Sequence, residues 1–437
     1  MRGILPGLIL MFIFFQRGLS NEHSAKQDEG TVNSCNSGHC SVAGDEGPCR
    51  DDGIQRLYHW DPVKVGYKRK LRLEGEKIYT MITRAIQPAL FEIPDFLSPE
   101  EADHIIDVAE DVGFLKSSIH LDPVAKKHAA TLRSMEGHSN SSAGYFLNWD
   151  FDRDYEITKD EVSTFAKKVK YLYMSLEEVD EMITKLDLKE FEDGVVEYEE
   201  WRSFKTHAID MYMNDMKEKH PHHKDRFSDQ VWLFQNTDAD EILKTLRERV
   251  YKLTRLRKGI VYGGEPLQVV KYGPHGHYHA HYDSSRKTDY PDGTKCCHYD
   301  LQNAPMAKCR ICRYITILYY LNDVEEGGET AFPVADMKNF NETKFRDRID
   351  GDRFNLKEYC QTANIVVPAK KGKAILWYNY DLDEHTGWMD NRDDRSLHGG
   401  CVVKKGMKYI ANNWLPAPEN DSAHLISEYF LDPDEEY

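Results

Sequence analysis

Two histidines and one aspartate, His281, Asp283 and His398, are the residues of this chain best suited to chemistry. Two imidazoles and a carboxylate are the ligand set of non-heme Fe(II) oxygenases, which leaves positions open for an oxo-acid cosubstrate and dioxygen. Side chains two positions apart on a β-strand share a face, so we expect His281 and Asp283 to reach one metal ion. His398 must come from another strand, because it lies far along the chain in Ser396-Leu397-His398-Gly399-Gly400.

Lys408 adds a cation to this set. It heads the apolar run Tyr409-Ile410-Ala411, which is typical of a strand. An ammonium there can pair with the distal carboxylate of a dicarboxylic acid whose other end chelates iron. The spacing therefore predicts a site for a metal and an oxo-acid rather than an isolated tripeptide.

Five motifs follow one another in the second half of the chain: Tyr272-x3-Gly276-x-Tyr278-x2-His281-x-Asp283, Arg313-Tyr314-Ile315-Thr316-Ile317-Leu318-Tyr319-Tyr320-Leu321-Asn322, Gly327-Gly328-Glu329-Thr330-x-Phe332-Pro333, Trp377-Tyr378-Asn379-Tyr380, and Ser396-Leu397-His398-Gly399-Gly400 with Lys408 and Trp414. In order and spacing these motifs resemble the prolyl 4-hydroxylases. The resemblance implies hydroxylation at C4 of peptidyl proline, with Fe(II), 2-oxoglutarate, O2 and L-ascorbate as cofactors.

The resemblance also implies a role for each residue of the site. The two histidines and the aspartate bind Fe(II), and the lysine anchors the distal carboxylate of 2-oxoglutarate. Tyr320 matches a tyrosine that also reaches this carboxylate, and core packing is its alternative. The other positions that line the cosubstrate pocket correspond to Tyr272, Asn412 and Trp414, each with packing as the alternative.

His275, His277, His279 and His281 alternate, so on one continuous strand all four would share a face. A zinc- or nickel-binding histidine tract is the competing interpretation. It leaves the distal histidine and the lysine unexplained, so we favour the iron site. The first three histidines are then expected to be substrate-side or loop residues.

An acidic segment ahead of these motifs has the spacing of an EF-hand loop. Its oxygen ligands for Ca²⁺ are expected from Asp150, Asp152, Asp154, Glu156 and Glu161. Tyr155 stands where glycine is usual, which predicts a distorted loop. A second loop ends at Glu200 but has Lys189 and Phe191 at its first and third positions, so it is expected to be a structural pseudo-site. The alternative for both is an acidic helix-loop-helix surface without metal.

The organisation expected for the 437 residues is α+β, with a double-stranded β-helix (jelly-roll) dioxygenase core and an inserted all-α pair of EF-hands. A helix is expected to begin at Ser98-Pro99-Glu100-Glu101, which has the residues of a capping box. The expected boundaries are 1–20 for a signal peptide or short anchor, 21–59 for a flexible stalk, 60–137 for the first part of the catalytic domain, 138–212 for the calcium-binding insert and 213–437 for the remaining catalytic domain.

The leader indicates the secretory pathway. Ile4 to Phe15 is apolar but shorter than the roughly 20 residues needed to span a bilayer, so a cleaved signal peptide is favoured over an uncleaved anchor. Sequons at Asn140, Asn341 and Asn420 fit a glycoprotein facing the lumen of the endoplasmic reticulum, soluble or membrane-associated.

Nine cysteines leave at least one thiol free or in an intermolecular bond. Cys296, Cys297, Cys309 and Cys312 fit either a four-thiolate zinc site or disulfides, and an oxidising lumen favours disulfides. Cys401 is expected to be a buried packing residue.

A proline-containing peptide or protein, collagen-like or hypoxia-inducible-factor-like, is the expected partner. The net charge of −17 argues against a nucleic-acid partner. Two other functions stay open: the same oxygenase chemistry on another peptidyl side chain, or a luminal calcium sensor with a vestigial oxygenase fold. The sequence has no heptads or interface stripe that would indicate an oligomeric state.

Overall fold

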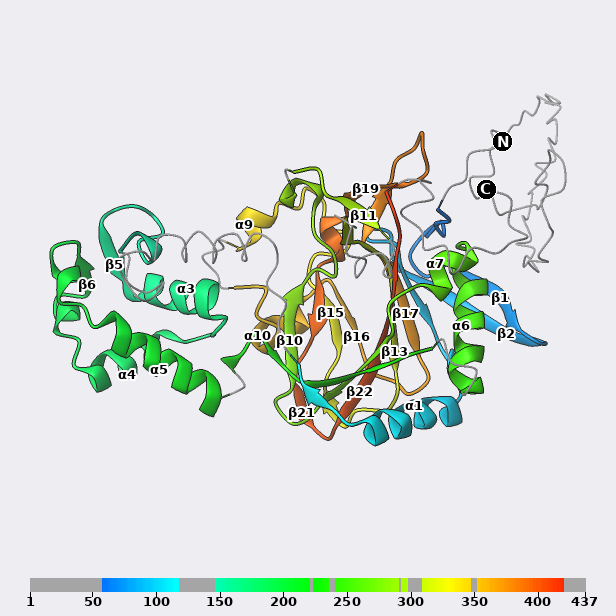
Figure 1. Cartoon of the computed structure of the whole chain (residues 1–437), viewed down its shortest axis with the longest axis horizontal. Coiled ribbons are helices and arrows are strands. Elements are labelled where there is room, and N and C mark those ends of the chain that lie inside the picture. Colours follow the sequence, from blue (N-terminus) through cyan, green and yellow to red (C-terminus); the bar gives the residue numbers. More distant parts are fainter. Residues whose placement is uncertain are drawn as a thin grey trace, which may run out of the picture.

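The computed structural model describes residues 57–117, 146–220, 223–235, 240–290, 292–297, 309–346 and 352–419. They form a larger part built on β-sheets and a smaller helical part to one side of it (Figure 1). The expected leader, most of the expected stalk and the sequons at Asn140 and Asn420 lie outside these residues. No helix within the described ranges is long and apolar enough to cross a membrane.

Two antiparallel sheets make up most of the larger part. The first has the strand order β1-β2-β3-β17-β13-β22-β9-β8-β4. Its strands are β1 (Lys68–Glu74), β2 (Lys77–Ala85), β3 (Leu90–Ile93), β17 (Ala374–Tyr378), β13 (Arg313–Tyr320), β22 (Lys408–Pro416), β9 (Leu267–Tyr272), β8 (Asp229–Leu233) and β4 (Leu115–Lys116). The second has the order β16-β15-β20-β10-β7. Its strands are β16 (Ile365–Val367), β15 (Thr330–Phe332), β20 (His398–Gly400), β10 (His277–His281) and β7 (Arg226–Phe227).

Apolar side chains fill the space between the two sheets. Tyr320, Trp377 and Ile410 of the first sheet belong to one buried cluster with Phe332 and Val367 of the second. The rings of Phe332 and Trp377 meet edge to face, with centroids 5.3 Å apart. Side chains on the inner faces of β10, β20 and β22 therefore project into a largely buried space, in which the side chain of His281 is 22% exposed.

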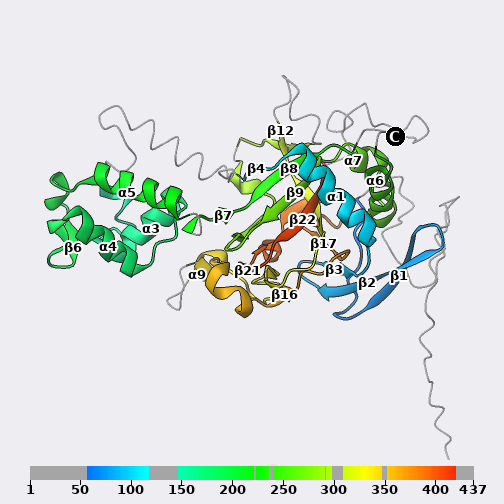
Figure 2. The same ribbon diagram turned by 90° about the horizontal axis from the view of Figure 1, so that it is seen from below.

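Helices cover the outer face of the first sheet (Figure 2). They are α1 (Pro99–Val112), α6 (Glu241–Thr254) and α7 (Lys258–Tyr262). The predicted start of α1 is confirmed, because Ser98 and Glu101 form a complete capping box. Arg249 of α6 is almost fully buried and pairs with Glu74 and Glu101, each at 2.6 Å. A buried guanidinium needs such partners, so α6 is tied both to β1 and to the start of α1.

The helical part has its own apolar core. Its helices are α3 (Lys159–Lys170), α4 (Leu176–Leu186) and α5 (Thr206–Lys219). They surround Trp149 and Phe165, whose rings are stacked 3.6 Å apart. Met213 and Met216 of α5 are buried in the same cluster. The expected boundary at residue 212 thus falls inside a helix, and the helical part extends to the end of α5.

Residues on both sides of the expected boundary at residue 59 are packed into the larger part. Leu57 is buried in the cluster that lies under the helices of the larger part. Trp60, which follows, donates its indole N–H to the carbonyl of Leu253 at 2.8 Å. Ordered packing therefore begins by Leu57.

Three disulfides stabilise the larger part. Cys296 pairs with Cys312 and Cys297 with Cys309, which confirms disulfides rather than a zinc site. Cys360 pairs with Cys401, so the expectation that Cys401 is only a packing residue is wrong. The two cysteines are 41 residues apart, so their pairing could not be predicted from local sequence. The pair forms because a short 3-10 helix, η7 (Cys360–Thr362), lies against the chain just after β20.

Candidate active site

An irregularity in β10 turns His281 away from the histidines before it. Tyr278 pairs with Gly400 and His281 with His398, so β10 has one residue more than β20 between the two pairs. Such a bulge reverses the alternation of faces, and the rings of Tyr278 and His281 are stacked 3.6 Å apart. The four histidines would share a face only on one continuous strand, and the bulge interrupts the alternation before His281.

His277 and His279 lie on the opposite face of β10 and are buried. The ring nitrogens of His277 are 2.8 and 2.7 Å from the carbonyl oxygens of His275 and Lys224. Nδ1 of His279 accepts a hydrogen bond from the backbone of Leu356, and burial holds the pKa of His279 well below its usual value. Both rings are packed into the protein and are not the substrate-side or loop residues expected.

The structure brings His281, Asp283 and His398 together. One ligand atom from each lies within 4.8 Å of the others. Nε2 of His281 is 3.8 Å from Oδ1 of Asp283, and Nε2 of His398 is 3.6 Å from Oδ2. The three ligand atoms are thus close enough together to bind one metal ion.

The backbone sets the tautomer of both rings. Nδ1 of His281 is 2.9 Å from the carbonyl oxygen of His279, and Nδ1 of His398 is 2.8 Å from that of Ser396. A ring that donates from Nδ1 keeps the lone pair of Nε2 for a metal. Burial, followed by the nearby His398, lowers the pKa of His281 to about 3, so this ring is neutral at physiological pH.

Two side chains of the first sheet hold the carboxylate of Asp283. Thr316 donates its hydroxyl to Oδ2 at 2.7 Å, and Trp414 donates its indole N–H to the same oxygen at 3.0 Å. Asn379 in turn donates to the Thr316 hydroxyl at 2.9 Å and accepts from the indole of Trp377 at 3.0 Å. The carboxylate is thus oriented before any metal binds.

Charge also favours the ionised form of Asp283. Burial alone would raise its pKa, but His398, His281 and Arg313 outweigh burial, and the pKa lies below the usual value. Arg313 is itself fixed by a bidentate contact with Glu265 at 2.6 and 2.8 Å, and its guanidinium lies 3.6 Å from the ring centroid of Trp414. Trp414 therefore positions the metal-binding carboxylate of Asp283, whereas the sequence predicted only that it lines the cosubstrate pocket.

Replacing Trp414 with phenylalanine should weaken metal binding about tenfold, because losing a hydrogen bond to a metal ligand commonly costs ten- to a hundredfold in affinity. Titration with Co(II) measures the metal affinity of each variant. Trp232→Phe is the matched control, since its ring lies 5.8 Å from that of Trp414 without contacting Asp283. Equal metal affinities of the two variants would refute the positioning role.

Lys408 lies on the same inner face of β22 as Trp414 and is 1% exposed. Among the described residues, no hydrogen bond or ion pair reaches its ammonium, and its nearest aromatic contact is the ring of Tyr272 at 5.2 Å. Burial lowers the pKa of Lys408 to about 7, against the opposing charge of Glu329. A buried ammonium without an anion is costly, so this position is prepared for an anionic ligand.

Gly400 leaves room beside this lysine. A Cβ atom at Gly400 would lie 3.7 Å from Nζ of Lys408 and 3.9 Å from the Tyr272 hydroxyl. Tyr320 and Thr330 are close to each other, yet neither hydroxyl makes a well-formed hydrogen bond within the described part of the chain. Hydroxyls buried without partners are uncommon, and together with the ammonium they suit a carboxylate.

Asn412 occupies the same inner face of β22, as expected of a pocket residue. Its amide donates to the side chain of Gln268 at 3.1 Å, and Gln268 donates to Gln230 at 2.7 Å. These bonds place Asn412 in a row of amides across β22, β9 and β8.

The predicted calcium loop gathers Asp150, Asp152 and Asp154, with one carboxylate oxygen from each within 4.8 Å of the others. Tyr155 has a φ of 71°, the left-handed conformation that glycine would adopt more easily. Glu161 caps α3 through the backbone of Thr158 at 2.9 Å and also accepts from Phe151 at 2.7 Å. Its carboxylate is thus drawn back toward the start of the loop.

The second acidic loop lies beside the first. Strand β5 (Glu156–Thr158) pairs with β6 (Val195–Glu197), which sets Ile157 opposite Val196. Lys189 and Phe191 form a 3-10 helix where the second loop begins, and Phe191 is buried. The residues at the first and third positions of this loop, Lys189 and Phe191, offer no carboxylate for a cation.

Comparisons with known proteins agree with this site. Residues 267–416 match the family described as the 2OG-Fe(II) oxygenase superfamily. A viral collagen prolyl hydroxylase from Paramecium bursaria Chlorella virus-1, solved with 2OG, is 23% identical; the likeness covers 48% of this chain and 88% of that one, with a TM-score of 0.27. The human transmembrane prolyl 4-hydroxylase is 36% identical over 371 residues, 85% of this chain and 72% of that protein. The mouse protein of the same name is 37% identical over 360 residues, covering 82% and 69%.

The chain belongs to the transmembrane prolyl 4-hydroxylase family. The site of this family member fits the cofactors of a 2OG-Fe(II) oxygenase. Two imidazole nitrogens and one carboxylate suit Fe(II), and the buried ammonium with its neighbouring hydroxyls suits the distal carboxylate of 2-oxoglutarate. Thr316 and Asn379, which the sequence did not single out, lie within the motifs that carried the resemblance, but only the fold reveals their contact with Asp283.

Proposed function

We propose that this chain is an Fe(II)- and 2-oxoglutarate-dependent dioxygenase that hydroxylates C4 of proline in a peptide or protein. The observation that carries the proposal is that the buried ammonium of Lys408 on the first sheet lies beside Gly400 of the second, two residues after His398 of the His281, Asp283 and His398 cluster. The relatives named prolyl 4-hydroxylases support the choice of proline.

In this proposal the residues of the site have different roles. His281, Asp283 and His398 would hold Fe(II), and three protein ligands leave coordination positions free for other ligands. Lys408, with the hydroxyls of Tyr320 and Tyr272 nearby, holds the distal carboxylate of 2-oxoglutarate and so directs the oxo-acid end toward the metal. Bound iron would activate O2, so that one oxygen atom enters succinate, formed with CO2 from 2-oxoglutarate, and the other enters the prolyl ring. The closely packed sheets exclude water from this step.

Turnover with proline-containing peptides tests the proposal. We expect one succinate released per hydroxyproline formed, with collagen-like or hypoxia-inducible-factor-like peptides as first substrates and L-ascorbate sustaining activity. Release of succinate without formation of hydroxyproline would indicate that another peptidyl side chain is hydroxylated. Bound iron without succinate from any peptide would favour a sensor with a vestigial oxygenase fold.

We further propose a double-stranded β-helix catalytic core, made of the two facing sheets, with an EF-hand pair inserted between β4 and β7. Calcium regulation is part of this proposal, because the insert contacts the back of the strand that carries the iron ligand. Tyr173, between α3 and α4, packs against His279 with ring centroids 4.3 Å apart. Lys167 of α3 forms an ion pair with Asp352. A Ca²⁺-dependent change in the insert would thus reach β10.

Calcium at 1 mM should raise the thermal midpoint of unfolding of the wild-type protein, because a ligand that binds only the folded state stabilises it. Asp150→Ala should abolish this rise. Asp193→Asn, in the second loop, is the matched control and should leave the rise intact. If calcium changes neither the thermal unfolding nor the turnover of the wild-type protein, the insert has only a structural role.

The proposed location is the lumen of the endoplasmic reticulum, either membrane-associated or soluble. The disulfides are in keeping with an oxidising compartment. Asn341, the sequon asparagine within the described residues, is exposed at the start of α9 (Glu342–Arg346) and accessible to glycosylation.

A further inference from the structure

The iron ligands are carried by two chain segments that strand pairing holds together only in part. β10 and β20 pair at Tyr278 with Gly400 and at His281 with His398. Beyond the second pair, one segment leaves β10 through Asp283 and the other approaches β20 from Arg392. No ladder of backbone hydrogen bonds joins these two continuations within the described residues. Something else must set the separation of Asp283 from His398.

Tyr282, the residue between two of the ligands, bridges the gap. Its hydroxyl donates to the carbonyl oxygen of Asp394 at 3.1 Å. Asp394 begins the 3-10 helix η8 (Asp394–Ser396), which ends two residues before His398. The guanidinium of Arg392 lies over the Tyr282 ring, 3.5 Å from its centroid. A cation at this distance from an aromatic face restrains both partners.

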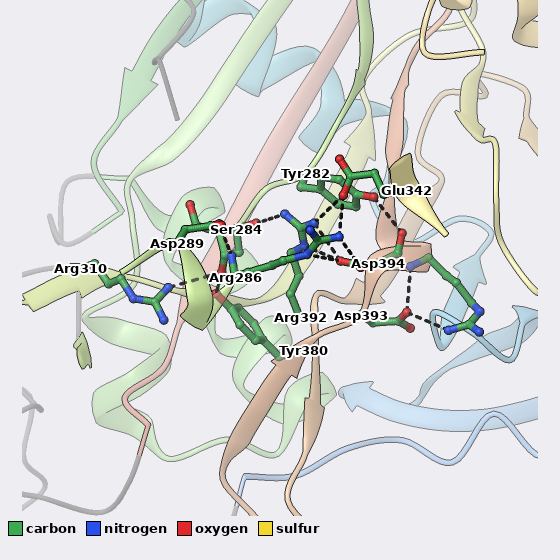
Figure 3. A network of polar contacts seen from close by, with 12 residues as sticks. Tyr282, Ser284, Arg286, Asp289, Arg310, Glu342, Tyr380, Arg392, Asp393 and Asp394 are labelled. Carbon is green, nitrogen blue, oxygen red and sulfur yellow. Dashed lines mark hydrogen bonds and ion pairs between the residues drawn. The ribbon is translucent and has the colours of Figure 1, made fainter. Parts of the chain in front are cut away.

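A charged cluster reinforces the same bridge (Figure 3). Arg286, three residues after Asp283, donates to the Asp394 carboxylate and to Glu342, the latter at 2.6 Å. Arg392 donates to the same Asp394 carboxylate at 2.8 Å and to the carbonyl of Ser284 at 3.2 Å. Two guanidiniums and two carboxylates balance in charge, and bidentate contacts of this kind fix geometry as well as energy.

We propose that Tyr282, Arg286, Arg392, Asp394 and Glu342, which we name the loop brace, are positioning residues that set metal affinity. The loop brace joins the segment bearing His281 and Asp283 to the segment bearing His398, and thereby fixes the third ligand relative to the other two. The inference rests on the proposed function, in which these ligands bind Fe(II).

Co(II) titration of the full chain tests the loop brace without turnover. Tyr282→Phe removes one hydroxyl and keeps the ring. Tyr314→Phe is the matched control, because the Tyr314 hydroxyl also donates to a backbone carbonyl, that of Tyr58, at 3.1 Å, and binds no ligand-bearing segment. We expect the dissociation constant for Co(II) to rise about tenfold in Tyr282→Phe and less than about twofold in the control. The visible spectrum of bound Co(II) should change only in Tyr282→Phe.

Asp394→Asn provides a second variant, which weakens both arginine contacts while keeping the backbone carbonyl that Tyr282 uses. It should also weaken Co(II) binding, and its effect and that of Tyr282→Phe should not add, since both act on one brace. Folded variants that bind Co(II) as tightly as wild type, or a control weakened equally, would overturn the inference. Wild-type protein that binds Co(II) but forms no hydroxyproline would defeat the proposed function alone, whereas wild-type protein that binds no metal would defeat both.

Discussion

Replacing Lys408 with methionine is expected to raise the KM for 2-oxoglutarate by about 100-fold or more. Removing one partner of a buried charge pair costs about 2 to 5 kcal/mol, and Lys408 is the cation that lies beside Gly400 and Tyr272 in this part of the pocket. The unliganded variant should also unfold at a higher temperature than wild type, because methionine removes a buried charge that lacks an anion. Succinate release and thermal unfolding measure the two effects.

The pH dependence of 2-oxoglutarate binding gives an independent check on Lys408. Because its pKa is about 7 in the unliganded protein, the ammonium loses its proton as the pH rises above 7. A carboxylate binds the charged form, so affinity should fall by up to about tenfold per pH unit above that value. Lys408→Arg keeps its charge and should flatten the profile. A wild-type profile that is flat from pH 6 to 9 would contradict this role.

The same titration affects folding stability. The pKa of Lys408 is lowered from 10.5 to about 7 in the folded protein. Between these values the unfolded chain binds more protons, so this residue makes the unliganded protein more stable as the pH rises from 7 toward 10.5. Saturating 2-oxoglutarate should remove this trend.

Replacing His281 with alanine should abolish succinate and hydroxyproline together, a loss of at least about 1000-fold, because the ligands act as one unit. The change also removes the ring that stacks on Tyr278, so metal content must be measured beside activity. His385→Ala removes an exposed imidazole from the turn between β18 (Tyr380–Leu382) and β19 (Met389–Arg392) and should leave turnover unchanged. Turnover that survives His281→Ala would refute the ligand assignment.

The strands and the metal ligands could be predicted from the sequence more readily than the contacts between strands that are distant in the chain. The apolar runs that became β13, β17 and β22 are buried along nearly their whole length, so their pattern is strong and local. The bonds from Thr316 and Trp414 to Asp283 join residues far apart in the chain. Nothing in local periodicity reports such contacts, and the same holds for the disulfide between Cys360 and Cys401.

The alternation of histidines in the sequence does not show which of them share a face, because strand register depends on both paired strands. The pattern of β10 alone predicts one shared face, whereas pairing with β20 introduces the extra residue. The shared face of Lys408, Asn412 and Trp414 follows from the regular alternation of β22. Tyr272 lies opposite Lys408 in the neighbouring strand.

The extra residue in β10 makes the metal site depend on strand pairing as well as on residue type. If β10 kept its present length but paired with β20 as a regular ladder beyond Tyr278, the imidazole of His281 would be directed toward the side now occupied by His279. Every ligand residue would still be present in the sequence. Loss of the bulge can therefore erase such a centre while the His-x-Asp signature survives, and designers who transplant the segment from Tyr278 to Asp283 must keep the bulge with it.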